Sequence, residues 1–104
     1  MVIKAKDNDT RVTGRSTGAP VRQIRNALTK QYQDLEAQGA GLEELEKLAL
    51  GSLRRAVVEG DTKAGTFMAG QIAGLVKEER TCKEIVETMI GDAENLIKNF
   101  QVNV

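Results

Sequence analysis

Apolar residues recur every three or four positions through most of the chain after residue 20, and this spacing predicts a mainly α-helical fold. Pro20 suits the first turn of a helix, and Gly39 suits a helix end because glycine adopts left-handed backbone angles easily. We therefore expect a helix over residues 20–38. Its buried stripe is predicted to consist of Val21, Ile24, Leu28, Tyr32 and Leu35.

Similar patterns follow along the chain. The leucines of residues 42–48 predict a second, short helix, and residues 53–57, closed by Gly60, predict a third. Residues 67–79 predict a fourth helix made mostly of small and apolar residues. Its helical spacing is carried by Met68, Ile72, Leu75 and Val76.

The last predicted helix has the clearest start signal. Thr81 and Glu84 have the form of a capping box, in which each side chain satisfies a free backbone amide at the helix start. A stripe suited to burial then recurs at helical spacing. It consists of Ile85, Met89, Ala93, Leu96 and Phe100.

Residues 10–13 alternate in a way that predicts one short β-strand. A single strand cannot form a sheet, and the rest of the sequence offers no convincing second strand, so we expect a further portion of protein to complete the fold. The predicted organisation is a polar lead-in with the strand (1–19), a small helical domain (20–80) and a C-terminal helix (81–104).

Composition limits the chemistry of the chain. With 104 residues, of which 40% are hydrophobic and 3% aromatic, we expect one small domain with an aliphatic core and no pocket of stacked rings. The absence of histidine excludes histidine-based hydrolase triads and metal sites. A lone cysteine, Cys82, excludes a disulfide framework. We find no run that would cross a membrane and no signal peptide, and we expect a cytoplasmic protein.

Charge is distributed unevenly although the formal net charge is zero. Residues 1–33 carry seven Lys and Arg against Asp7 and Asp9. This basic end is a candidate surface for an acidic partner, and ordinary solvated charge is the alternative. Nucleic acid is not an expected partner, because Tyr32 alone is available for stacking. The candidate contacts are Arg11, Arg15, Arg22 and Arg25, with the last two on one side of the predicted helix.

Gly70 and Gly74 stand four residues apart within the predicted helix 67–79. Each interior glycine costs about 1 kcal/mol relative to alanine, so this pattern indicates close approach of another backbone, of a neighbouring helix or of a ligand. Gln71 between them carries an amide that both donates and accepts hydrogen bonds. A buried glutamine satisfied by nearby backbone and recognition of the edge of a heterocycle both remain open.

Two stretches, residues 51–61 and 65–76, closely resemble the C-terminal region of a family of flavin enzymes, the FMN-dependent enoyl-[acyl-carrier-protein] reductases II and nitronate monooxygenases. The specific part is the run methionine, alanine, glycine, glutamine, isoleucine, alanine, glycine at 68–74. Residues 4–7, 10–14, 20–22, 26 and 28–29 also match in order, so the resemblance covers nearly the whole chain. Ala19 departs from the larger polar residue that relatives often carry before the proline.

The resemblance implies that the chain is a fragment of a TIM-barrel flavoprotein: a small helical domain and a last helix that returns to a barrel. The barrel, with its FMN phosphate loops and catalytic histidine, lies outside these residues, so we expect no catalytic residue here. The implied cofactor contacts are Met68, Ala69, Gly70 and Gln71.

The implied reaction passes a hydride from NAD(P)H through FMN to an enoyl thioester, with acyl carrier protein as a possible acidic partner. Oxidation of alkyl nitronates by FMN and oxygen is the alternative within the family. A free-standing, non-enzymatic helical module that binds an acidic protein is the alternative outside it. Without a barrel, the apolar stripes of helices 20–38 and 81–100 would be exposed, and we expect self-association through them.

Overall fold

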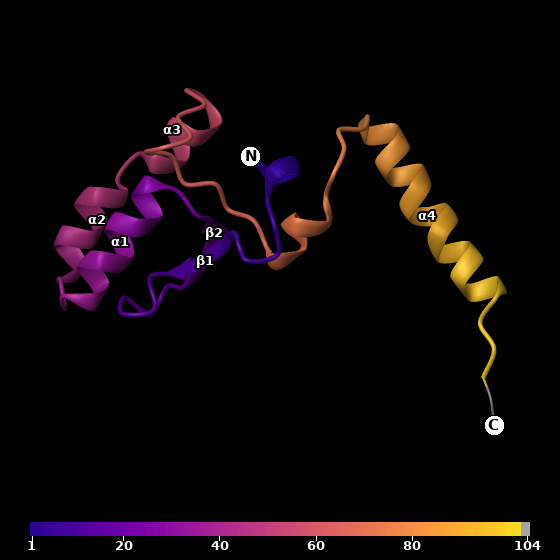
Figure 1. Cartoon of the computed structure of the whole chain (residues 1–104), viewed down its shortest axis with the longest axis horizontal. Coiled ribbons are helices and arrows are strands. Elements are labelled where there is room, and N and C mark those ends of the chain that lie inside the picture. The colour runs from indigo at the N-terminus through magenta and orange to yellow at the C-terminus, as the bar shows by residue number, and fades with distance from the viewer. Residues whose placement is uncertain (103–104) are drawn as a thin grey trace.

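The computed structural model describes residues 1–102, which form a hairpin with a helical layer and a separate C-terminal arm (Figure 1). The elements in chain order are η1 (Val2–Lys4), β1 (Thr10–Thr13), β2 (Val21–Ile24), α1 (Ala27–Ala37), α2 (Leu42–Ala49), α3 (Ser52–Val57), η2 (Gln71–Leu75) and α4 (Cys82–Lys98), where η denotes a 3-10 helix. The fold is mostly helical, as predicted, with one small sheet.

Residues 21–24 form a strand and not the start of a helix, so the predicted start of the first helix was wrong. β1 and β2 pair antiparallel, with Thr10 opposite Ile24 and Thr13 opposite Val21, so the expectation of a single unpaired strand was also wrong. Gly14 makes the reversal possible with a φ of 81°, and a Cβ there would lie 2.5 Å from the carbonyl oxygen of Ala19. The apolar residues at 21 and 24 do have helical spacing, but pairing with β1 stabilises the extended conformation instead.

Helix α1 starts only at Ala27, where Asn26 provides the cap. The Asn26 side chain accepts a hydrogen bond from the Thr29 backbone amide at 3.0 Å. α1 lies against α2 and β1, and the buried core includes Leu28 of α1, Leu45 of α2 and Ala56 of α3. The predicted helices 42–48 and 53–57 are confirmed as α2 and α3.

Residues 67–79 do not form the predicted continuous helix. Residues 67–69 run extended along the free edge of β2: the Ile24 amide donates to Phe67 O at 2.9 Å, and the Ala69 amide donates to Arg22 O at 3.3 Å. The five-residue η2 follows. The glycines in this segment disfavour a helix. Hydrogen bonds to β2 satisfy backbone groups that helical hydrogen bonds would otherwise have satisfied.

The expectation of a close backbone approach is met at one of the two glycines. A Cβ on Gly74 would lie 2.9 Å from the backbone nitrogen of Asp7, so glycine allows η2 to lie directly against the chain after η1. A Cβ on Gly70 would meet nothing within 4 Å.

Helix α4 starts at the predicted capping box, in which Glu84 N donates to Thr81 Oγ1 at 3.2 Å and Thr81 N donates to Glu84 Oε2 at 2.8 Å. The helix stands apart from the other elements, and none of its residues is buried. The Cα radius of gyration is accordingly 18.2 Å, against about 13 Å for a compact chain of this length.

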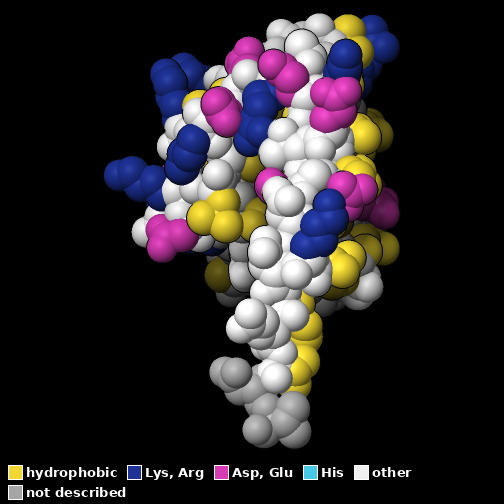
Figure 2. All heavy atoms as spheres, turned by 90° about the vertical axis from the view of Figure 1, so that its right-hand side faces the viewer, with side chains coloured by type: hydrophobic (Ala, Val, Ile, Leu, Met, Phe, Trp, Pro, Cys, Tyr) yellow, Lys and Arg dark blue, Asp and Glu magenta, His cyan; other side chains and the backbone are white. Residues whose placement is uncertain are grey.

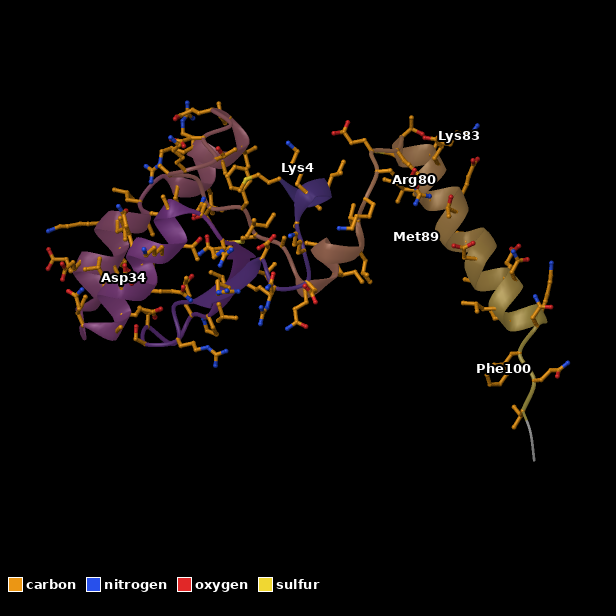
Figure 3. All side chains as sticks on the ribbon, in the orientation of Figure 1. Lys4, Asp34, Arg80, Lys83, Met89 and Phe100 are labelled. Atoms are coloured by element: carbon orange, nitrogen blue, oxygen red, sulfur yellow. The ribbon has the colours of Figure 1, made fainter. Side chains whose placement is uncertain are left out.

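The arm exposes its apolar stripe. Met89 and Phe100 lie on a part of the molecule well separated from Lys4 and Asp34 (Figure 3). Viewed from the side of the arm, hydrophobic side chains form a band beside charged ones (Figure 2). The exposed large apolar residues of α4 are Ile85, Val86, Met89, Ile90, Leu96 and Ile97. Despite this surface, no helix within residues 1–102 has both the length and the hydropathy needed to cross a membrane.

The contact between Gly65 and α3 gives a prediction for stability. A Cβ on Gly65 would lie 2.5 Å from Asp61 O and 2.8 Å from Ala56 Cα, both backbone atoms, so Gly65→Ala should lower the free energy of unfolding by about 1–3 kcal/mol. Gly70→Ala is the matched control, with a permitted φ of −75° and open space. Urea unfolding followed by circular dichroism measures both, and equal effects would contradict this account of Gly65.

The exposed stripe of α4 gives a prediction for association. We expect the 104-residue chain to self-associate, and the double substitution Ile85→Glu and Met89→Glu to weaken that association about tenfold or more, because it places charge in the apolar stripe. Glu87→Gln, on the opposite side of the helix, should leave association unchanged. Sedimentation velocity over a concentration series measures the effect; a monomeric wild-type chain would refute it.

Candidate functional site

Residues 68–71, the predicted cofactor contacts, form a ledge along the edge of β2. Met68 is bridged to Gln23 of β2 and exposes 56% of its surface, while Ala69 is half-buried. Gly70 caps η2, and Gln71, its first residue, is exposed. A buried Gln71 satisfied by backbone is therefore excluded. The structure brings the four residues together as one accessible surface.

A cavity of about 420 Å³ lies behind Met68. It is bounded by the hairpin, by α1 and by the junction of α2 and α3. Its lining consists of Thr13, Gly14, Ala19, Val21, Gln23, Leu28, Tyr32, Ala49, Gly51, Ser52, Leu53, Thr66 and Met68.

Sequence reasoning missed this cavity and its buried polar groups. Gln23 is 4% exposed, and its Nε2 donates to Thr13 Oγ1 at 2.8 Å. Thr66 Oγ1 donates to Ser52 Oγ, also at 2.8 Å. Gln23 Oε1 is buried without a hydrogen-bond partner among the described residues. The sequence carries no clear signal for them, because residues 21–24 do not alternate between apolar and polar. Strand geometry alone turns Val21 and Gln23 to one face.

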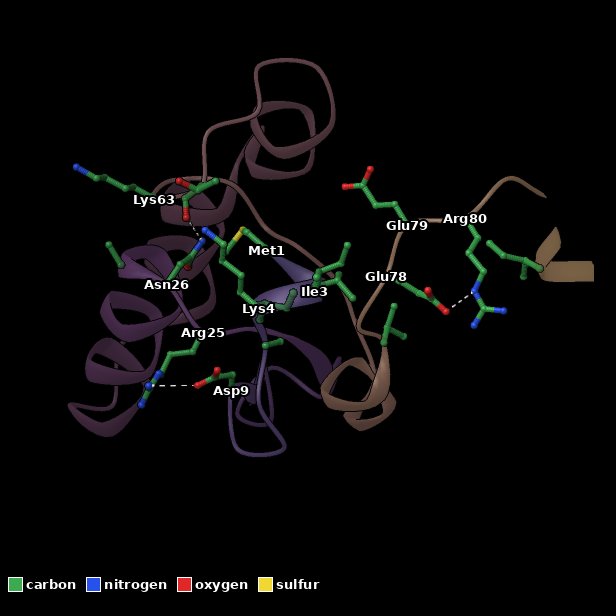
Figure 4. Close-up of a pocket in the computed structure, with 17 residues that line it drawn as sticks. Met1, Ile3, Lys4, Asp9, Arg25, Asn26, Lys63, Glu78, Glu79 and Arg80 are labelled. Atoms are coloured by element: carbon green, nitrogen blue, oxygen red, sulfur yellow. Dashed lines mark hydrogen bonds and ion pairs between the residues drawn. The ribbon is translucent and has the colours of Figure 1, made fainter. Parts of the chain in front are cut away.

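A second hollow, of about 1280 Å³, lies between η1, the start of α1 and the residues before α4 (Figure 4). Charged side chains line it, and several are already paired. Arg25 lies 3.5 Å from Asp9, and Arg80 lies 3.0 Å from Glu78. The hollow extends to Ile85 on the arm, so its far wall belongs to an element that contacts little else.

The four candidate partner arginines do not share one face. Arg22 lies in β2 and Arg25 follows it, so the prediction that they occupy one side of a helix was wrong. Arg11 donates to Asn8 O at 2.6 Å, Arg22 donates to Thr10 Oγ1 at 3.0 Å, and Arg25 pairs with Asp9. Of the four, Arg15 alone forms no side-chain hydrogen bond or ion pair within residues 1–102, and it is exposed at the hairpin loop.

Glu36 of α1 fixes the loop that carries Arg15. Its Oε1 accepts hydrogen bonds from Gly14 N at 3.1 Å, Ser16 N at 3.2 Å and Ser16 Oγ at 2.8 Å. Partial burial raises the pKa of Glu36, but these hydrogen bonds and the charge of Arg15 outweigh burial, so the net pKa is below its ordinary value of 4.5. The ionised form therefore stabilises the hairpin loop.

This interaction predicts a pH dependence. Because the folded-state pKa of Glu36 is lowered, its stabilisation is fully present above the ordinary value of 4.5 and is lost as the pH falls below 4.5 through the folded-state value. Glu36→Gln should flatten the fall in unfolding free energy over this range. The carboxylates of Asp61 and Glu84, whose pKa values are lowered by backbone hydrogen bonds from Ala64 and Thr81, contribute equally in both proteins.

The matched control for Glu36→Gln is Glu46→Gln, which changes an exposed carboxylate of α2. Urea unfolding at a series of pH values gives the slope for each variant. The account fails if Glu46→Gln flattens the profile as much as Glu36→Gln does.

Comparison with known proteins gives consistent results. FabK from Thermotoga maritima superposes with a TM-score of 0.84 at 38% identity, covering 93% of this chain and 30% of that chain. A mutant of the same protein superposes with a TM-score of 0.73 at 35% identity, covering 93% and 28%. These chains are thus more than three times as long as the part that matches.

Two curated relatives match a shorter segment. Both are (3aS,4S,5R,7aS)-5-hydroxy-7a-methyl-1-oxo-octahydro-1H-indene-4-carboxyl-CoA dehydrogenases, one from Mycobacterium tuberculosis and one from Rhodococcus jostii. Each is 39% identical over 41 residues, which is 39% of this chain and 12% of the relative. The family model described as nitronate monooxygenase matches residues 1–92. The chain therefore belongs to the nitronate monooxygenase family.

Proposed function

We propose that this chain is the C-terminal portion of an FMN-dependent oxidoreductase of the enoyl-[acyl-carrier-protein] reductase type, in which residues 68–71 form one wall of the flavin site. The observation that carries the proposal is the accessible 68–71 ledge within a chain that superposes on FabK over 93% of its length. These four adjacent residues, which the hydrogen bond from Ala69 N to Arg22 O ties to β2, are suited to contact a planar ligand.

The residues present fit the edge of a flavin ring and do not by themselves enclose the cofactor. Gly70 has open space where a side chain would lie, so a ring can approach the backbone. The exposed Gln71 amide donates to a ring carbonyl or accepts from a ring N–H, and the Met68 thioether contacts an aromatic face. Bound FMN would supply the hydride chemistry; these residues position it and exclude water from one side.

Thioester substrates are favoured over alkyl nitronates by the two curated relatives, whose names describe dehydrogenases of a carboxyl-CoA compound. Nitronate monooxygenase activity, which needs FMN and oxygen, is the second candidate because the matching family carries that name. NAD(P)H as the reductant belongs to the first candidate.

Two protein contacts follow from the proposal. The apolar stripe of α4 faces the remainder of a longer FabK-like chain, where a barrel buries it. Acyl carrier protein docks near Arg15, which lies exposed on the hairpin loop that Glu36 fixes through Gly14 and Ser16. Arg11, Arg22 and Arg25 do not share a face with Arg15, and each already has a partner within the chain.

A pair of chimeras tests the proposed function. In one, this chain replaces the matching C-terminal part of Thermotoga maritima FabK; in the other, it replaces the corresponding part of a nitronate monooxygenase. We expect the FabK chimera to purify with FMN and to oxidise NAD(P)H in the presence of an enoyl thioester. A folded chimera without flavin would refute the flavin wall. Activity with alkyl nitronates in the second chimera alone would move the assignment to the monooxygenase.

Gln71→Ala in the FabK chimera tests the ledge itself. Loss of one hydrogen bond of about 1–1.5 kcal/mol should weaken FMN binding about tenfold, measured by titrating apoprotein and following flavin fluorescence. Gln31→Ala is the matched control, because Gln31 is an exposed glutamine on α1, away from the ledge. Equal FMN affinity in the two variants would exclude a contact from Gln71.

A further inference from the structure

The cavity of about 420 Å³ behind Met68 has a volume within the range of small-molecule sites. No Lys, Arg, Asp or Glu lines it, in contrast to the larger hollow next to η1. A phosphate, a carboxylate or a nucleotide would find no opposite charge among these lining residues. The lining therefore favours an uncharged occupant.

The polar groups of the cavity are largely occupied by one another. Thr66 donates to Ser52, and Gln23 donates to Thr13, each at 2.8 Å. Gln23 Oε1 has no partner, but the atom is itself inaccessible, so it forms no part of the cavity wall. What an occupant meets is mainly the apolar surface of Val21, Leu28, Tyr32, Leu53 and Met68.

Met68 joins this cavity to the 68–71 ledge. It lines the cavity, and it is also the first residue of the run expected to contact flavin. A substrate whose reacting double bond lies against a flavin at the ledge therefore has an apolar space within reach for the group beyond that bond.

We propose that this cavity binds the acyl chain of the thioester substrate, a subsite that deepens the proposed function and rests on it. The thioester and its charged carrier stay outside, since the lining offers them no partner. Chain length is then selected by cavity volume, which Ala49 and Leu53 at the α2–α3 junction delimit. Burial of each methylene tightens binding about fourfold until the cavity is full.

The experiment uses the 104-residue chain without flavin and a series of saturated acyl thioesters of N-acetylcysteamine, from acetyl to dodecanoyl. Amide chemical shifts report both the affinity and the place of binding. We expect affinity to rise about fourfold per methylene and then to level off, with the shifts concentrated at the cavity residues. Chain-length-independent affinity, or shifts confined to α4, would overturn the proposal.

Two variants with opposite effects make the test specific. Ala49→Leu fills the cavity and should move the plateau to a shorter chain, by about the three carbons that it adds; Leu53→Ala should move it to a longer one. Ala37→Leu and Leu50→Ala, neither of which lines the cavity, are the matched controls. If Ala49→Leu does not fold, Leu53→Ala alone provides the test. An unchanged plateau chain length in Leu53→Ala would refute the acyl-chain subsite.

The same titration on the FabK chimera tests whether the rest of the protein, and not an acyl chain, fills the cavity. If a side chain from the rest of the protein fills the cavity, the chain-length dependence seen with the isolated chain disappears in the chimera, and the proposal is wrong. Since the isolated-chain experiment contains no flavin, its failure leaves the flavin wall untouched. A chimera that lacks flavin but still shows chain-length selection would support the acyl-binding cavity. It would refute only the proposed flavin-dependent function.

Discussion

The structure depends on hydrogen bonds along both edges of β2. On one edge β2 pairs with β1, and on the other the Ile24 amide donates to Phe67 O while the Ala69 amide donates to Arg22 O. Leaving one such backbone group buried and unpaired costs about 1–3 kcal/mol, so neither edge separates easily. A segment more than forty residues later in the sequence is thereby held against the hairpin. This is how residues 68–71 acquire a defined position without belonging to a long helix.

Asn26 extends that connection to α1. Its Oδ1 accepts from the Thr29 amide as a helix cap, while its Nδ2 donates to Thr62 O at 3.0 Å and to Gly65 O at 2.7 Å. One side chain thus satisfies a free helix amide and two loop carbonyls. The loop before the 68–71 ledge is therefore tied to the same helix start that follows β2. Movement of the ledge relative to α1 would have to break these contacts together.

Elements defined by local interactions were predictable from the sequence. The Thr81 and Glu84 capping box, and the short helices containing Leu45 and Ala56, are fixed by neighbours within a few residues. The strand at residues 21–24 was not predicted, because its apolar spacing also fits a helix and its partners lie in distant segments. The extended course of residues 67–69 was missed for the same reason. The proximity of Met68 to Gln23 requires both non-local pairings and was beyond a local pattern.

The register of β2 decides how the two hollows differ. Gln23 and Val21 point to the side of the uncharged cavity, and Thr13 on β1 joins them there. Ile24, on the alternate face, borders the charged hollow that contains Asp9 and Arg25.

Because side chains alternate along a strand, a shift of one residue in the pairing of β2 would exchange these faces and direct Arg22 toward the cavity. A guanidinium there would be buried without a carboxylate among the lining residues, which is energetically unfavourable. The apolar character of the cavity and the pairing register of the hairpin therefore support each other, and the same pairing keeps Met68 at the boundary between the cavity and the ledge.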